Sequence, residues 1–213
     1  AEMRTFGAGS PFFNFFVGQD RKYVKNIVPQ LSQGGTTLPD RDYYLKSDAR
    51  SVQIQAAYKN YIAKLFTLTG TPEAQAKINA ESVFNFEKKL AEAQMSRVEM
   101  RDPYKTYNKF AVTDFTKTTP NLNWQNLLPL MKVSNQDTLL VSSPKFFTAL
   151  NAAISSTPVN DLKTYLRWNL LKSSAPYLSS EFVNANFAFN QVISGQKVQT
   201  PRWQRMSSLT DGT

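Results

Sequence analysis

Two consecutive amphipathic helices, predicted from Ser47 to a stop signal at Arg101-Asp102-Pro103, constrain the fold of this chain most strongly. In the first, which Ser47 is expected to cap, apolar residues recur at spacings of three and four from Ile54 to Leu68, and Gly70 ends the run. The second begins at Thr71–Glu73, which supplies a cap, a proline suited to the first helical turn and an acidic residue. Because each helix has one apolar face, both need a partner surface. The pattern therefore favours a helical globular domain.

A different pattern, one of short β-prone segments, occupies the first 46 residues. Phe12 to Val17 and Tyr23 to Leu31 are predicted as two strands joined by a turn at Gly18 to Asp20. Pro29 cannot donate a hydrogen bond to a neighbouring strand, so the second segment is predicted at the edge of a sheet. A loop containing glycine and proline follows from Ser32 to Asp40. The sequence therefore predicts a small β-hairpin near the N-terminus.

Shorter elements fill the rest of the chain. Cap signals and apolar spacing predict helices over residues 121–131, 144–153, 158–171, 180–193 and from 202 onward, with a short strand at 138–141. No repeat of fixed period is present, so a solenoid is not predicted. We therefore expect a mainly α fold, a multi-helix domain with a small β-hairpin near the N-terminus. Residues 1–46 are expected to form a hairpin and loop segment of the same domain, and residues 47–213 a helical bundle.

Composition excludes several classes of protein. The chain has 213 residues, 41% of them hydrophobic, which is enough for a substantial core. Its apolar runs are far shorter than the roughly 20 residues of a membrane-spanning helix, so no transmembrane segment is expected. The absence of cysteine excludes a disulfide framework. The net charge of +9 admits an anionic partner, yet basic residues come singly or in pairs such as Arg21-Lys22, so no nucleic-acid partner is expected.

The residues that most enzymes use for metal or acid–base chemistry are missing. With no histidine and no cysteine, the chain cannot form a zinc site of imidazole and thiolate ligands, a Ser-His-Asp triad or a Cys-His pair. Ser142 to Lys145 matches a Ser-x-x-Lys pattern, but the companion Lys-Thr-Gly and Ser-Asp-Asn motifs are absent. A serine before Pro144 is better explained as a helix start. Glycine-rich phosphate loops are absent too.

Paired carboxylates are a catalytic option that does not require histidine or cysteine. A glycosidase uses two acidic side chains that flank the scissile bond. The candidates are Asp40, Asp42, Glu81, Glu87 and Glu92. Most of them stand beside Lys or Arg on predicted helix faces or in a loop, which is typical of solvated ion pairs. We therefore expect no catalytic residue in this chain.

Six short motifs occur in order along the sequence, and the longest runs almost without a break from Gly34 to Leu45. The others are Arg101-Asp102-Pro103 with Tyr107-Asn108, Pro120 with Trp124, Leu166-Arg167-Trp168, Phe189-Asn190 through Gly195, and Pro201-Arg202-Trp203-Gln204-Arg205. Together they resemble the non-catalytic domain of the neprilysin-like zinc metallopeptidases, the M13 family. The first motif is similar to that family's Gly-Leu-Pro-x-Arg-Asp-Tyr-Tyr segment. The resemblance covers nearly the whole chain.

This resemblance implies a mostly helical domain that covers the active-site chamber of a zinc endopeptidase and limits access to short peptides. In the family, the zinc ligands and the catalytic glutamate lie in a later part of the chain. The longer protein that carries this chain, called the parent protein below, is therefore expected to be a zinc metalloendopeptidase, and this chain alone to be inactive. Zinc is expected in the parent protein and no cofactor in this chain. A periplasmic or cell-envelope location is implied.

The resemblance also implies partners and site residues. The partners are the C-terminal catalytic domain of the same polypeptide, absent from this sequence, and peptide substrates of the parent protein. Candidates for the chamber wall are Arg41, Asp42, Tyr43, Tyr44, Arg101 and Asp102. We favour the simpler interpretation that these groups pair inside the domain and hold loops against helices. No catalytic or metal-binding residue is predicted.

An alternative function of another class stays open from the sequence. The chain could be an independent basic helical module that binds a protein or nucleic acid, because its net charge is +9. That function predicts tight, salt-dependent binding to an anionic polymer.

Overall fold

Helices make up most of the part of the chain that the structure, a computed structural model, describes. That part is residues 9–210, without the side chains of 209 and 210. The helices are α2 (Asp42–Leu45), α3 (Ala49–Leu68), α4 (Glu73–Ala93), α5 (Arg97–Met100), α6 (Val112–Thr118), α7 (Trp124–Leu130), α8 (Pro144–Ser156), α9 (Val159–Ser174), α10 (Ser180–Ser194) and α11 (Arg202–Thr210). The strands are β1 (Phe13–Gln19), β2 (Ile27–Gln33), β3 (Asn108–Ala111) and β4 (Thr138–Val141). The predicted fold class, mainly α with a small hairpin near the N-terminus, is confirmed.

The two long helices α3 and α4 follow the predicted apolar spacing, but α4 ends at Ala93, before the predicted stop at Arg101, and the short helix α5 follows it. On α4, Val83, Phe86 and Leu90 are buried, as their spacing indicates. The predicted N-cap of α3 was wrong by one residue: Asp48, and not Ser47, caps the helix. Its carboxylate accepts hydrogen bonds from the backbone amides of Arg50 and Ser51, two groups that have no partner inside the helix.

The sheet has four strands in the order β1-β2-β4-β3. The β1–β2 hairpin is antiparallel over seven residue pairs, β2 and β4 are parallel, and β3 and β4 are antiparallel. The prediction that the Pro29 segment forms an edge strand was wrong, since β2 has neighbours on both sides. The pairing with β4 starts at Gln30, one residue beyond Pro29. The missing amide hydrogen of Pro29 therefore interrupts no part of that ladder.

One hydrophobic core extends through both ends of the molecule. Near the sheet, β1, α6, α7 and α8 contribute an aromatic cluster of Phe13, Phe115, Trp124 and Phe147. Between α3, α9 and α10, a second cluster contains Tyr58, Tyr61, Trp168 and Phe189, in which the rings of Tyr61 and Phe189 stack 4.8 Å apart. Large aromatic side chains thus supply much of the buried surface.

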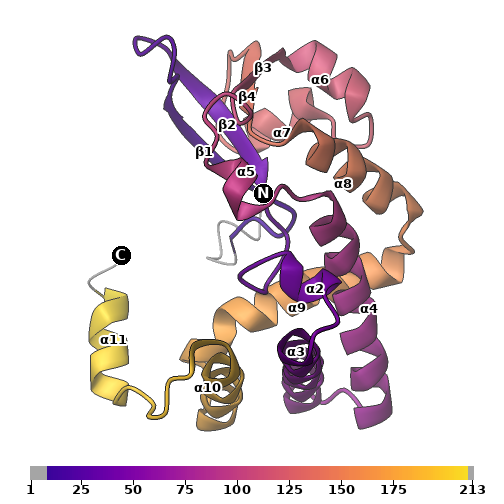
Figure 1. The fold of residues 1–213 in the computed structure, drawn as a ribbon, viewed down its shortest axis with the longest axis vertical. Helices are drawn as coiled ribbons and strands as arrows, with labels where there is room; N and C mark the ends of the chain where they lie inside the picture. The colour runs from indigo at the N-terminus through magenta and orange to yellow at the C-terminus, as the bar shows by residue number, and fades with distance from the viewer. Residues whose placement is uncertain (1–8, 211–213) are drawn as a thin grey trace.

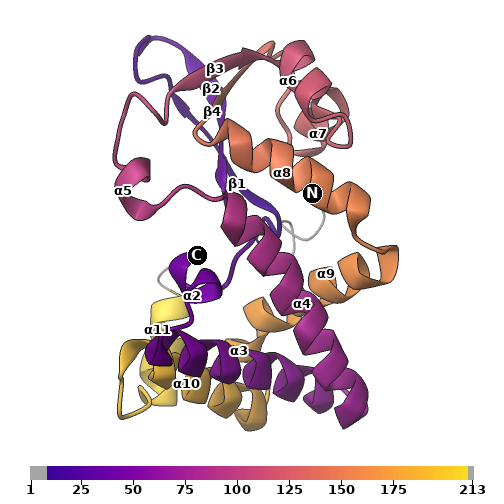
Figure 2. The same ribbon diagram turned by 45° about the vertical axis from the view of Figure 1, so that its right-hand side comes forward.

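The helices and the sheet are arranged so that α4 connects two ends of the molecule. Figure 1 shows the sheet with α6, α7 and α8 at one end, and α3, α9 and α10 at the other. In Figure 2, α4 runs diagonally between these ends, with α8 and α9 on one side and α2 and α5 on the other. The motif from Gly34 to Leu45 links β2 to α3, so it passes beside the middle of the molecule.

Candidate functional site

Glu87 is a fully buried carboxylate on the inner face of α4. Its two oxygens accept hydrogen bonds from the hydroxyls of Tyr44 (2.5 Å), Tyr58 (2.8 Å) and Thr37 (2.8 Å), and from the backbone amide of Thr37 (3.2 Å). A buried charge is costly unless it is hydrogen-bonded, and these four donors meet that need. The cluster joins α2, α3 and α4 to the loop before α2.

The tyrosine hydroxyls around Glu87 are held in their protonated form. Burial and then the charge of Glu87 raise the pKa of Tyr44 well above its ordinary value, and the same causes raise the pKa of Tyr58. Both hydroxyls therefore stay hydrogen-bond donors. The half-buried Lys172 adds a positive charge, and its ammonium lies 3.1 Å from the Thr37 hydroxyl. Burial lowers the pKa of Lys172, while the charge of Glu87 acts in the opposite direction.

The loop of residues 34–40 depends on a glycine where it passes α4. Gly35 has a φ of +75°, and a Cβ atom there would lie 2.7 Å from Leu90 Cδ1 and 2.8 Å from the carbonyl oxygen of Phe12. The carbonyl of Gly35 accepts a hydrogen bond of 2.8 Å from the buried hydroxyl of Tyr165. The next part of the loop is held by Tyr44, whose hydroxyl accepts hydrogen bonds from the backbone amides of Thr37 (2.9 Å) and Leu38 (2.8 Å). The longest motif is thus held mainly by internal contacts.

A basic cavity of about 410 Å³ lies on the other side of this loop, between the end of α4 and α5. Three arginines line it: Arg41, Arg97 and Arg101. Arg41 donates to the carbonyl of Gln94, and Arg97 forms an ion pair of 2.9 Å with Asp40. The guanidinium of Arg101 is exposed and has no partner among residues 9–210. With three cations and one carboxylate in its wall, the cavity attracts negative charge. We take this arginine-lined cavity as the candidate functional site.

The structure brings together only two of the six predicted wall residues. Arg41 and Arg101 line the arginine-lined cavity, whereas Asp42, Tyr43, Tyr44 and Asp102 do not. Asp42 forms an ion pair of 2.7 Å with the ammonium of the C-cap lysine that follows α2. Tyr44 is buried at Glu87, and the Tyr43 carbonyl accepts a hydrogen bond of 2.9 Å from α3.

The Asp102 side chain stabilises the turn that follows α5. Its carboxylate accepts hydrogen bonds from the backbone amides of Tyr104 (2.9 Å) and Lys105 (3.2 Å), which turns the chain after α5. This turn leads to Tyr107, on which a second buried carboxylate depends.

Three residues at these sites were missed by reasoning from the sequence: Glu87 as a buried hub, Lys172 as its nearby cation, and Arg97 as a cavity residue. Glu87 carried a usable signal, because positions 83, 86, 87 and 90 fall on one helix face and three of them are apolar. A carboxylate inside such a stripe indicates a buried polar network. Arg97 and Lys172 carried no comparable signal, since their neighbours come from distant parts of the chain.

Asp20 is the second buried carboxylate, at the turn of the β1–β2 hairpin. Burial alone would raise its pKa. Hydrogen bonds from the amide of Lys22, the hydroxyl of Tyr107, the amide of Tyr23 and the ammonium of Lys109 outweigh burial and lower the pKa of Asp20 to about 2. The hairpin is thereby tied to the segment that leads into β3.

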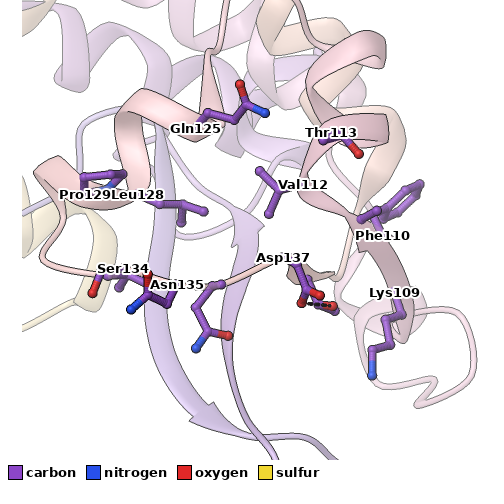
Figure 3. A pocket seen from close by; sticks show the side chains of 14 residues that line it. Lys109, Phe110, Val112, Thr113, Gln125, Leu128, Pro129, Ser134, Asn135 and Asp137 are labelled. Atoms are coloured by element: carbon purple, nitrogen blue, oxygen red, sulfur yellow. Dashed lines mark hydrogen bonds between the residues drawn. The ribbon is translucent and has the colours of Figure 1, made fainter.

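A larger cavity of about 870 Å³ opens beside β3 and α7. Figure 3 shows Val112 and Leu128 between these elements, with the Lys109 side chain extending away from them. The carboxylate in its wall, Asp137, accepts a hydrogen bond of 2.9 Å from the Thr138 hydroxyl, and Lys109 is paired with Asp20. The lining therefore offers no pair of free titratable groups for acid–base chemistry.

Residues 9–210 contain neither a metal-binding cluster nor a membrane-spanning helix. No group of three or more acidic side chains in that range is placed to hold a metal ion. None of its helices has both the length and the apolar character needed to cross a bilayer.

Comparison with known proteins gives consistent matches along the chain. Bovine (Bos taurus) endothelin-converting enzyme 1 is 28% identical over 210 residues, and the match covers 96% of this chain and 28% of the bovine protein. Neprilysin-3 of Drosophila melanogaster is 27% identical, with 93% of this chain and 27% of the fly protein covered. The chain thus spans little more than a quarter of the length of these relatives.

Solved structures show the same fold. Zinc metalloprotease Zmp1 of Mycobacterium tuberculosis, in complex with an inhibitor, matches 99% of this chain and 32% of its own chain, with a TM-score of 0.90 and 25% identity. PepO of Lactobacillus rhamnosis matches 99% of this chain and 33% of its own, with a TM-score of 0.84 and 18% identity, a likeness of fold alone.

These matches give no support to an independent nucleic-acid-binding or protein-binding module. The sequence profile of peptidase family M13 matches residues 1–213. The predicted resemblance is confirmed, and this chain belongs to the N-terminal part of peptidase family M13.

Proposed function

We propose that this chain is the non-catalytic wall of the substrate chamber in an M13 zinc metalloendopeptidase, where it covers the active site and limits access to short peptides. The observation that carries the proposal is the arginine-lined cavity, which contains Arg41 and Arg101 from two of the family-like motifs. Buried contacts fix the loop that presents Arg41, as a wall requires. The catalytic chemistry is assigned to the rest of the parent protein.

The buried network supports a passive role for most of the motif. Glu87 has four hydrogen-bond donors and no exposure, so it is unavailable as a general base or a metal ligand in this fold. Its function in the proposal is to hold residues 37–44 in place. Zinc and its ligands are therefore expected in the catalytic domain of the same polypeptide, which is the proposed partner of this chain.

The first test is whether the isolated chain hydrolyses peptides. We expect no zinc-dependent turnover of an internally quenched peptide by residues 1–213, with or without added zinc. Activity that copurifies with the chain through a second purification and is lost on chelation would contradict the proposal.

The second test labels the cavity in the parent protein. Because this chain has no cysteine, Arg101→Cys introduces one thiol at the cavity, and Lys77→Cys introduces one on the exposed face of α4 as a matched control. A bulky maleimide at position 101 should lower kcat/KM by about tenfold, more for long peptides than for short ones, since a loss of this size corresponds to about 1.4 kcal/mol. The same label at position 77 should leave kcat/KM unchanged. Equal effects at both positions, or none at either, would remove Arg101 from the chamber wall.

A bacterial cell-envelope location goes with this proposal. It is supported by the fold shared with metallopeptidases from bacteria, one of them a zinc metalloprotease of Mycobacterium tuberculosis. Fractionation of cells that produce the parent protein tests it, and recovery of the protein with a cytoplasmic marker would contradict it.

A further inference from the structure

A small cavity of about 130 Å³ lies between the start of α10 and α11, away from the arginine-lined cavity. Figure 1 shows α11 beside α10 and set apart from the other helices. The cavity is lined on one side by the residues before and within the first turns of α10, and on the other by Gln199, Arg202 and Arg205. It therefore occupies the junction through which α11 is joined to the rest of the domain.

Two side-chain nitrogens of this junction lack hydrogen-bond partners among the described residues. Arg205 Nε and Gln199 Nε2 are both buried, and neither atom has a hydrogen-bond acceptor among residues 9–210. A buried donor without an acceptor is destabilising, so two such donors in one cavity indicate a missing acceptor. Arg202 adds a second guanidinium to the lining, and no acidic side chain lines the cavity to balance the two charges.

The start of α10 adds to the positive character of the cavity. Ser180, the first residue of this 15-residue helix, lines the cavity, and the side chain of the N-cap residue Ser179 makes no capping hydrogen bond. Glu181 in the first turn of α10 offsets part of the helix dipole, but it does not line the cavity, so the uncapped start of the helix still lies beside the two arginines. Each of these features favours an anion.

The size and the apolar part of the lining narrow the class of anion. At about 130 Å³, the cavity has room for a small group. Leu178, Val183 and Met206 form part of its wall, a surface suited to an aliphatic stem rather than to a fully hydrated dianion. A carboxylate has two oxygens in one plane, which matches donors from a guanidinium and a primary amide.

We propose that the cavity between α10 and α11 binds one carboxylate group, which accepts hydrogen bonds from Arg205 and Gln199 and fixes α11 against the start of α10. The carboxylate is either that of an acidic side chain from a protein segment or that of a small free acid. This inference does not depend on the proposed chamber function, because it concerns another cavity and another helix pair.

The test follows the Arg Nε–H resonances of the 213-residue chain by NMR during titration with sodium acetate, against sodium chloride at equal ionic strength. Acetate should shift the Arg205 resonance saturably. In Arg205→Lys, the side-chain signals of Arg202 and Gln199 should respond to acetate with an apparent Kd about tenfold higher. Arg50→Lys is the matched control, since Arg50 already donates to the Val192 carbonyl and lies outside the cavity. Its acetate response should equal that of the unaltered chain.

Three outcomes would overturn the proposal: an unchanged Arg205 signal, an equal shift with chloride, or an apparent Kd for acetate in Arg205→Lys equal to that of the unaltered chain. A shift with inorganic phosphate but not with acetate would overturn the choice of a carboxylate. The indole N–H signal of Trp124, which donates to Thr119 in the core at 2.8 Å, reports whether each variant is folded. If a blocked peptide with one glutamate binds about tenfold more tightly than acetate and its glutamine counterpart does not bind, the carboxylate comes from a protein; equal affinity points to a small free acid.

Discussion

Tyr44→Phe removes one oxygen atom from the centre of the buried network and leaves the ring in place. The lost hydroxyl donates to Glu87 and accepts from the backbone amides of Thr37 and Leu38. The Thr37 amide retains a contact of 3.2 Å with Glu87, but the buried Leu38 amide is left without an acceptor. The perturbation therefore affects the loop and the carboxylate together.

The size of the effect follows from these partners. An unpaired buried amide costs about 1–3 kcal/mol, and a lost hydrogen bond to a charged group about 1.5–3 kcal/mol. Because groups in one network are not additive, we expect a total of about 3 kcal/mol in the free energy of unfolding. This is a large share of the roughly 5–15 kcal/mol that stabilises a typical domain.

Urea unfolding followed by the fluorescence of the buried Trp124 and Trp168 measures this change. With an m value of about 2 kcal/mol/M, the midpoint should fall by about 1.5 M. Tyr43→Phe is the matched control, since the half-buried Tyr43 hydroxyl has no hydrogen bond within residues 9–210, and it should change stability by less than about 0.5 kcal/mol. If the two variants unfold at the same urea concentration, the hydrogen bonds of Tyr44 do not hold the loop.

Two further variants test other parts of the scaffold. The pKa of Asp20 is lowered to about 2 in the folded chain, so its stabilising contribution is present above about pH 4 and is lost as the pH falls toward 2. In Asp20→Asn, the urea midpoint should depend less on pH over that range. Asp114→Asn, which removes the carboxylate of an exposed ion pair, should leave the pH dependence unchanged. Gly35→Ala should cost about 3 kcal/mol or more, because strain at positive φ adds to the clash with Leu90, while Gly70→Ala, with open space around its Cβ position, should cost about 1 kcal/mol; similar melting temperatures for the two glycine variants would contradict this.

The longer helices could be predicted from local pattern because each depends mainly on its own sequence, whereas the short helices α2, α5 and α6 were not predicted. The buried positions of α4 follow a spacing of three and four, and the start of α8 at Pro144 follows a serine-proline signal. The sheet could be predicted only in part. β3, from Asn108 to Ala111, is too short and too mixed in polarity to be found alone, and it exists because β4 pairs with it.

The candidate site was less accessible to prediction, since its neighbours are far apart in sequence. Arg41 and Arg101 were selected through their motifs, yet nothing in either motif indicates that the two side chains line one cavity with Arg97. Tyr44 was selected with them and lies instead at Glu87, 43 residues away. A motif therefore identifies residues that matter, and the fold decides which of them face inward.

This division between inward and outward residues determines how activity measurements on the parent protein should be interpreted. Tyr44 holds the loop from inside, and Arg41, three residues earlier, faces the cavity. A Tyr44 variant with reduced peptidase activity would thus be explained by movement of Arg41 and of its neighbours, without any chemical role for the phenol. The two explanations separate in one comparison: a structural effect of Tyr44→Phe should lower the urea midpoint of the isolated chain as well as kcat/KM of the parent protein, whereas Arg101→Ala, on an exposed side chain, should lower kcat/KM alone.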